Sequence, residues 1–147
     1  MGTVTGIALR EKAHAPMQTI ESVEISVEAG LHGDSRGKPG PRQVTLLSEG
    51  QWAEACETVE VDLAWTYRRA NLLVAGLRFS PDMVGDTVVI GDLKMEITGE
   101  TDPCVRMDQQ HQGLTQALTP DWRGGICCRV LQDGKVALGD AVEIVGR

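Results

Sequence analysis

Short runs of branched apolar residues recur along the chain and are separated by Gly, Asp or Pro. Such runs are typical of β-strands. The run over residues 94–98 also alternates polar and apolar side chains, as a half-buried antiparallel strand does. Many short strands with few helices predict a mainly β protein built as a closed or nearly closed β-barrel. The predicted strands cover residues 4–9, 22–27, 43–47, 71–74, 87–90, 94–98, 126–131 and 141–145.

Two segments are predicted to be short helices. Ser48 precedes the first, over residues 49–58, and its hydroxyl can accept a hydrogen bond from a free N–H of the first turn. The second covers residues 114–118 and ends near Pro120, because helical geometry is disfavoured before a proline.

Three short motifs predict turns at the ends of strands. Gly85-Asp86 and Gly139-Asp140 each precede a predicted strand. We interpret them as similar turns of one barrel, because Gly allows left-handed backbone and an Asp side chain can bond the neighbouring main chain. Asp133-Gly134 is typical of a hairpin and predicts that the segments on either side of it pair with each other.

Length and charge exclude several classes of protein. A chain of 147 residues predicts a single domain over residues 1–147. The net charge of −7 argues against a general nucleic-acid partner. We expect no membrane segment, because no apolar stretch approaches the ~20 residues that cross a bilayer. No secretory signal is visible, and four cysteines lack the density of a disulfide scaffold, so we expect a reduced, cytoplasmic protein.

The segment over residues 30–42 is rich in glycine and proline, which exclude regular structure, and it carries Arg36, Lys38 and Arg42. Backbone N–H groups and cations in one loop suit an anion such as a phosphate. The alternative is a mobile surface loop whose charges are only solvated.

Adjacent arginines, Arg68 and Arg69, precede the predicted strand that begins at Asn71. A guanidinium can bind a phosphate or carboxylate through two parallel hydrogen bonds. The alternative is that both arginines form weak surface pairs with acidic residues.

Cys104 follows Pro103 and lies two residues before Arg106. The proline stiffens the backbone, and a nearby cation lowers the pKa of a thiol toward its reactive, metal-binding thiolate form. The alternative is that Cys104 is a small buried hydrophobe, as most free cysteines are.

The neighbouring Cys127 and Cys128 should face opposite sides of a strand, with one in the core and the other pointing outward. No Cys-x-x-Cys pair occurs and the three histidines lack metal-ligand spacing, so the sequence does not predict a zinc site.

These motifs, in this order, resemble the MOSC family, the domain found at the C-terminus of molybdenum cofactor sulfurases. The resemblance covers nearly the whole chain, and its specificity comes from the order and spacing of motifs that are individually weak. The matching motifs are Gly30-Leu31-His32-Gly33-Asp34, residues 42–47, residues 68–77, Gly85-Asp86, Ile90-Gly91, Pro103-Cys104-Val105-Arg106-Met107, Gly124-Gly125, Arg129-Val130 and Gly139-Asp140.

The resemblance implies a stand-alone member with a β-barrel-like MOSC fold and a few short helices. It implies a molybdenum cofactor (molybdopterin), with Cys104 as the functional cysteine and molybdenum ligand. Arg106 would tune its thiolate. By the same resemblance, the cofactor-binding residues are Asp34, Arg36, Lys38, Arg42, Arg69 and Asn71.

Three functions remain open at this point. In the first, the protein binds the molybdenum cofactor and reduces N-hydroxylated substrates with an electron-donor protein as partner. In the second, Cys104 carries sulfur as a persulfide and delivers it to a metal–sulfur cofactor. We expect no pyridoxal-phosphate desulfurase domain in this chain, so the sulfur would come from a separate cysteine desulfurase. In the third, the domain only binds anions or other proteins.

Overall fold

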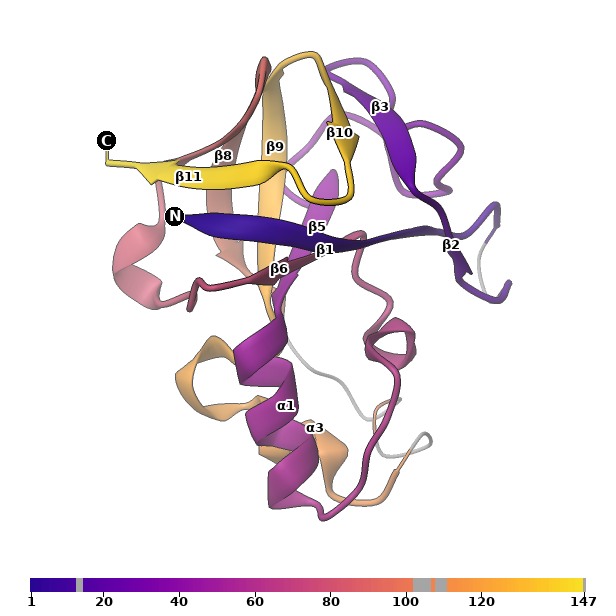
Figure 1. Cartoon of the computed structure of the whole chain (residues 1–147), viewed down its shortest axis with the longest axis vertical. Coiled ribbons are helices and arrows are strands. Elements are labelled where there is room, and N and C mark those ends of the chain that lie inside the picture. The colour runs from indigo at the N-terminus through magenta and orange to yellow at the C-terminus, as the bar shows by residue number, and fades with distance from the viewer. Residues whose placement is uncertain (13–14, 102–106, 108–110, 147) are drawn as a thin grey trace.

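A computed structural model describes residues 1–12, 15–101, 107 and 111–146 of the chain. Seven of the described strands close into a barrel, in the order β11, β7, β8, β9, β5, β6, β1 and back to β11 (Figure 1). Neighbouring strands of the ring run antiparallel, except for the parallel pair β5 and β6. The strands of the ring are β1 (Gly2–Leu9), β5 (Val44–Ser48), β6 (Leu72–Ala75), β7 (Thr87–Ile90), β8 (Leu93–Glu100), β9 (Ile126–Gln132) and β11 (Ala141–Val145).

Four further strands of the described chain lie outside the ring. One of them, β2, pairs with the end of β1, and the other three form a small sheet in the order β10, β3, β4. They are β2 (Gln18–Thr19), β3 (Ser22–Ser26), β4 (Gly30–Leu31) and β10 (Gly134–Ala137).

The barrel interior is filled by the apolar side chains that alternate along its strands. In β8, for example, Leu93, Met95 and Ile97 are fully buried while Lys94 between them is exposed. Closing the sheet removes its free edges, which would otherwise be open to pairing with other chains. The prediction of a mainly β, barrel-like fold is confirmed, and each predicted strand is present with its ends within two residues of the predicted ones.

Two α-helices of the described part of the chain pack at one end of the barrel, on the side away from β3 and β10 (Figure 1). They are α1 (Glu49–Thr58) and α3 (Leu114–Leu118), with the bounds that the sequence predicts. The Ser48 hydroxyl caps α1 by accepting a hydrogen bond of 3.3 Å from the Gln51 N–H, as predicted. Between the helices and the barrel lies a second apolar cluster that includes Trp52, Leu73 and Leu114. Three short 3₁₀ helices complete the described elements: η1 (Trp65–Arg68), η2 (Pro81–Met83) and η3 (Pro120–Trp122).

The predicted hairpin at Asp133-Gly134 is wrong, because β10 pairs with β3 and not with β9. The Asp133 carboxylate accepts a hydrogen bond of 2.7 Å from the N–H of Val27, just beyond the end of β3. Gly134 lies opposite Ile25 in the register of the pair. The turn therefore directs the chain away from β9 and into the small sheet.

The two Gly-Asp turns are equivalent, as the sequence predicts. Gly85 and Gly139 have positive φ angles of 91° and 89°, and the strands that follow, β7 and β11, pair with each other. Each turn makes two main-chain hydrogen bonds of 2.8 and 2.9 Å with a single residue of a neighbouring strand. That residue is Ile97 of β8 for the first turn and Val4 of β1 for the second. In the part of the chain that the structure describes, no helix is long and apolar enough to cross a membrane.

Candidate functional site

The glycine-rich segment over residues 30–42 begins with the short strand β4, so the prediction that it has no regular structure is wrong at Gly30 and Leu31. The rest of the segment, called the glycine-rich loop, is attached to the end of β1 through Asp34. The Asp34 carboxylate accepts hydrogen bonds from the N–H groups of Arg10 (3.1 Å) and Arg36 (3.2 Å). The N–H of Ser35 in turn donates to the carbonyl of Arg10 at 2.9 Å. Asp34 therefore shapes the loop around Arg36, and its predicted contact with a cofactor stays a prediction.

A second attachment is made by Gln43, whose side chain is buried below the loop. Its Nε2 donates to the carbonyls of Val27 (2.8 Å) and Gly37 (3.1 Å), and its Oε1 accepts from the N–H of Val130 at 3.0 Å. Gly37 packs so closely on the carbonyl of Ala29 that a Cβ atom has no room there. These contacts fix the middle of the loop and argue against a loop that is only solvated.

Gln43 is not among the site residues predicted from the sequence. The available signal was a polar amide at the start of an otherwise apolar strand, next to Arg42. A buried amide in that position has to find partners, and here its partners are the main-chain groups of the loop and of β9.

The three loop cations Arg36, Lys38 and Arg42 are exposed to solvent. Within the described residues, none of them forms a salt bridge. Other arginines of the chain do, since Arg78 pairs with Glu54 and Arg129 lies 3.6 Å from Glu96. Three positive charges on a fixed loop, in a chain of net charge −7, form a local site suited to an anion.

Arg68 is buried, and its guanidinium binds main-chain carbonyls. Its Nε donates to Gly124 at 3.0 Å and its Nη2 to Thr101 at 2.7 Å. Neither of the alternatives considered for the arginine pair, an anion fork or a weak surface pair, describes these contacts. Gly124 must be a glycine here, because a Cβ atom would lie 2.8 Å from the Thr101 oxygen and 3.0 Å from the Arg68 Nη2.

Arg69 and Asn71 lie between η1 and β6. Arg69 is half-buried and adopts left-handed backbone, with φ of 66°. The Asn71 Oδ1 accepts from the N–H (3.0 Å) and hydroxyl (3.2 Å) of Thr45, and its Nδ2 donates to the carbonyl of Ala8 at 3.2 Å. Asn71 therefore joins the beginning of β6 to β5 and β1, and its predicted contact with a cofactor, like that of Arg69, stays a prediction.

The end of β1 connects two of the predicted site segments. The main chain of Ala8 donates its N–H to the Asn71 carbonyl and accepts a hydrogen bond from the Asn71 side chain. Two residues further along, the main chain of Arg10 bonds to the Asp34 carboxylate and to the N–H of Ser35. The structure thus attaches the glycine-rich loop and the Arg-x-Asn segment to the same end of one strand.

Cys104 and Arg106 lie outside the described residues, but both flanks of their segment are described. On one side, Thr101 donates its N–H to the carbonyl of Gly125 at 2.9 Å and places its Oγ1 3.3 Å from the Cys127 Sγ. On the other side, Met107 is buried in the cluster between the helices and the barrel. The roles predicted for Cys104 and Arg106 stay predictions.

The other three cysteines, Cys56, Cys127 and Cys128, are all buried. Neither Cys127 nor Cys128 faces solvent, because both side chains are buried and the Thr101 hydroxyl lies against the Cys127 sulfur. The prediction that one of the two points outward is therefore wrong. Burial raises the pKa of the Cys128 thiol far above its ordinary value, and burial also raises the pKa of Cys56. Both thiols therefore stay protonated in the folded protein at neutral pH. The described residues contain no cluster of three or more potential metal ligands.

The MOSC domain model matches residues 32–143, and the chain therefore belongs to the MOSC domain family. This family is associated with the molybdenum cofactor. No curated protein matches the chain in sequence.

Three solved structures show the same fold. The YuaD protein of Bacillus subtilis is 18% identical with a TM-score of 0.82, and the match covers 100% of this chain and 97% of that one. YiiM of Geobacillus stearothermophilus is 17% identical with a TM-score of 0.80, covering 100% and 76%. YiiM of Escherichia coli is 19% identical with a TM-score of 0.72, covering 99% and 70%. At these identities the likeness establishes the fold alone.

Proposed function

We propose that this protein binds the molybdenum cofactor, with Cys104 as the ligand of molybdenum and the glycine-rich loop as the binding site of the cofactor's phosphate. The observation that carries the proposal is the set of exposed cations Arg36, Lys38 and Arg42, which have no acidic partner among the described residues. Membership of the MOSC family supports molybdopterin as the anionic ligand.

The residues of the loop suit a phosphate. Arg36 and Arg42 offer guanidinium forks, and Lys38 adds an ammonium group that can rotate toward an oxygen. Asp34 and Gln43 hold the backbone that carries these cations, so less conformational entropy is lost when an anion binds. Asn71, which bonds to Ala8 near the end of β1, and Arg69 would position the pterin.

A thiolate is a soft donor that suits a molybdenum–sulfur centre, and we propose that Arg106 keeps Cys104 in the thiolate form. When bound, the cofactor supplies two-electron redox chemistry, which we propose acts on N-hydroxylated substrates. An electron-donor protein would then be the partner. The chain's own residues bind and orient the cofactor.

Expression in a host that makes the cofactor, followed by molybdenum and pterin analysis, tests this function. We expect both in the purified wild-type protein and loss of molybdenum in Cys104→Ser. Combining Arg36→Ala with Arg42→Ala should lower pterin retention. The matched control removes two exposed cations from strands, Lys94→Ala with Lys135→Ala, and should retain the pterin. Wild-type protein that contains neither molybdenum nor pterin would overturn the proposal. If the two double variants lose equal amounts of pterin, the glycine-rich loop is not the binding site of the phosphate.

The second candidate is a sulfur carrier in which Cys104 forms a persulfide after contact with a cysteine desulfurase. The burial of the other three cysteines favours this assignment of the site, because a carrier thiol must be reached by its donor and acceptor. Mass spectrometry after incubation with a desulfurase should find one added sulfur, on Cys104. No adduct, or equal adducts on Cys56 and Cys127, would exclude the carrier.

If Cys104→Ser changes neither cofactor nor sulfur binding, the domain is an anion-binding or interaction module.

A further inference from the structure

A hollow lies on the barrel where β1 changes its neighbour. Thr3 pairs with β11, whereas Ala8 pairs with β2. Between these pairings, Thr5 and Gly6 have no partner in β11 or β2 within the described part of the chain. The register with β6 also shifts between Val4 and Gly6, as in a β-bulge, a feature that is common beside functional sites.

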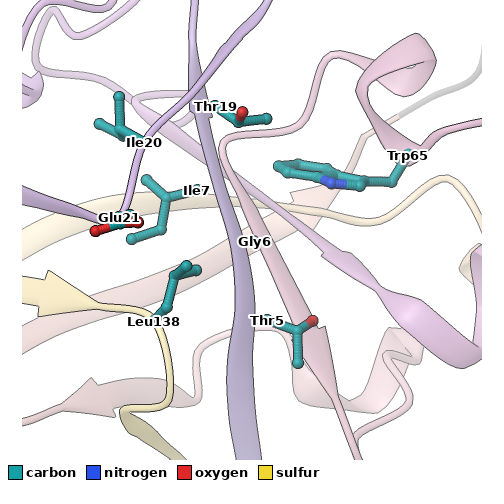
Figure 2. A pocket seen from close by; sticks show the side chains of 8 residues that line it. All are labelled: Thr5, Gly6, Ile7, Thr19, Ile20, Glu21, Trp65 and Leu138. Carbon is teal, nitrogen blue, oxygen red and sulfur yellow. The ribbon is translucent and has the colours of Figure 1, made fainter.

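The hollow has a volume of about 350 Å³, which is within the range of small-molecule sites. Figure 2 shows Trp65 on one side of β1 and Ile20, Glu21 and Leu138 on the other. The Trp65 ring lies directly against Gly6, where a Cβ atom would be only 2.7 Å from the ring carbon Cζ2. Glycine at this position is therefore what brings the indole close to the strand.

The walls of the hollow combine apolar side chains with polar ones and carry a negative charge. Leu138 is 45% exposed, so its side chain offers apolar surface at the hollow. Among the described residues that line the hollow, Glu21 is the one that carries a charge. A second carboxylate contacts a residue that lines the hollow, because the Thr5 hydroxyl donates a 2.7 Å hydrogen bond to Glu49 Oε2.

We propose that this hollow is a binding site for a small flat organic cation. The face of an indole attracts cations, the apolar side chains of Ile20 and Leu138 suit a flat ring, and the carboxylates of Glu21 and Glu49 favour positive charge. No lining residue in the described part of the chain is a cation that could neutralise the charge of an anionic ligand. The site shares no residue with the proposed cofactor site, so either proposal can fail without the other.

Phenylguanidinium is a suitable probe, because its neutral analogue phenylurea has nearly the same shape. Each tryptophan gives one indole N–H peak in a ¹⁵N–¹H NMR spectrum, and the peak of Trp65 is identified by its loss in Trp65→Phe. We expect phenylguanidinium to shift the Trp65 peak and the amides of Gly6 and Thr19 in a saturable way. Phenylurea should bind more weakly by about three-fold or more.

Glu21→Gln keeps the shape of an exposed side chain and removes its charge, so it should fold and weaken phenylguanidinium binding by about three-fold. Glu143→Gln, an exposed carboxylate of β11 outside the hollow, is the matched control and should bind as the wild type does. No saturable shift of the Trp65 peak would overturn the proposal. Equal affinity for the two probes, or equal weakening in both variants, would do so as well.

Discussion

The Arg68 guanidinium donates a 2.7 Å hydrogen bond to the carbonyl of Thr101, the residue that directly follows β8. The same side chain binds the carbonyl of Gly124, two residues before β9 begins. One buried arginine therefore joins η1 to the ends of two barrel strands, next to the segment that contains Cys104.

Replacing Arg68 with methionine should lower the free energy of unfolding by about 3 kcal/mol, because two buried carbonyls lose a charged donor. Urea unfolding followed by circular dichroism measures the change. Arg36→Met removes an exposed guanidinium from the loop and serves as the control, with little effect on the unfolding midpoint. Equal midpoints for Arg68→Met and the wild type would contradict a structural role for these hydrogen bonds.

Gly125 and Gly50 should respond to alanine in opposite directions. Gly125 has φ of 98° and no room for a Cβ atom beside the Leu46 carbonyl, so Gly125→Ala should cost more than about 2 kcal/mol of stability. Gly50 lies in α1 with open space around it, so Gly50→Ala should add about 0.5–1 kcal/mol. Thermal or urea unfolding of the two variants checks both signs, and a destabilised Gly50→Ala would count against the helical packing described for α1.

Local signals predicted local structure well in this chain. Ser48 and the residues after it contain what is needed to begin α1, and the apolar runs contain what is needed for strands. The partner of β10 could not be predicted, because Asp133 bonds to Val27, 106 positions away in the sequence. A turn motif describes the change of chain direction, but the partner strand depends on contacts that form only in the folded barrel.

The candidate site illustrates the same limit. The sequence indicated that the arginine pair and the glycine-rich loop were special, but it could not say that Arg68 is buried among carbonyls. The left-handed backbone of Arg69, directly after Arg68, was not predicted either. The hydrogen bonds of Asp34 and Asn71 were also unpredictable, since both connect segments that are distant in sequence.

Removing the Gln43 amide should loosen the glycine-rich loop. Gln43→Leu leaves the carbonyls of Val27 and Gly37 and the N–H of Val130 without this partner, so we expect a loss of about 2–4 kcal/mol. Trypsin should cleave after Arg36 faster than in the wild type, because cleavage requires local opening of the loop. Gln132→Leu, the same change at an exposed site of β9, is the control. Cleavage at equal rates in both variants would show that Gln43 does not hold the loop.

The pH dependence of stability should reflect the buried Cys128 thiol. Burial, and secondarily the neighbouring Cys127, raises the pKa of Cys128 in the folded protein, whereas the pKa of an unfolded cysteine is about 8.5. Below that pH both states are protonated and the contribution of the group is fully present. Above it the unfolded state loses the proton first, so stability falls as pH rises, by up to about 1.4 kcal/mol per pH unit.

Cys128→Val removes the titrating group from the barrel core, so the stability of this variant should fall less than that of the wild type between about pH 7.5 and pH 10. Urea unfolding at a series of pH values measures both curves, and parallel curves over this interval would contradict the burial of an ionisable thiol at this position.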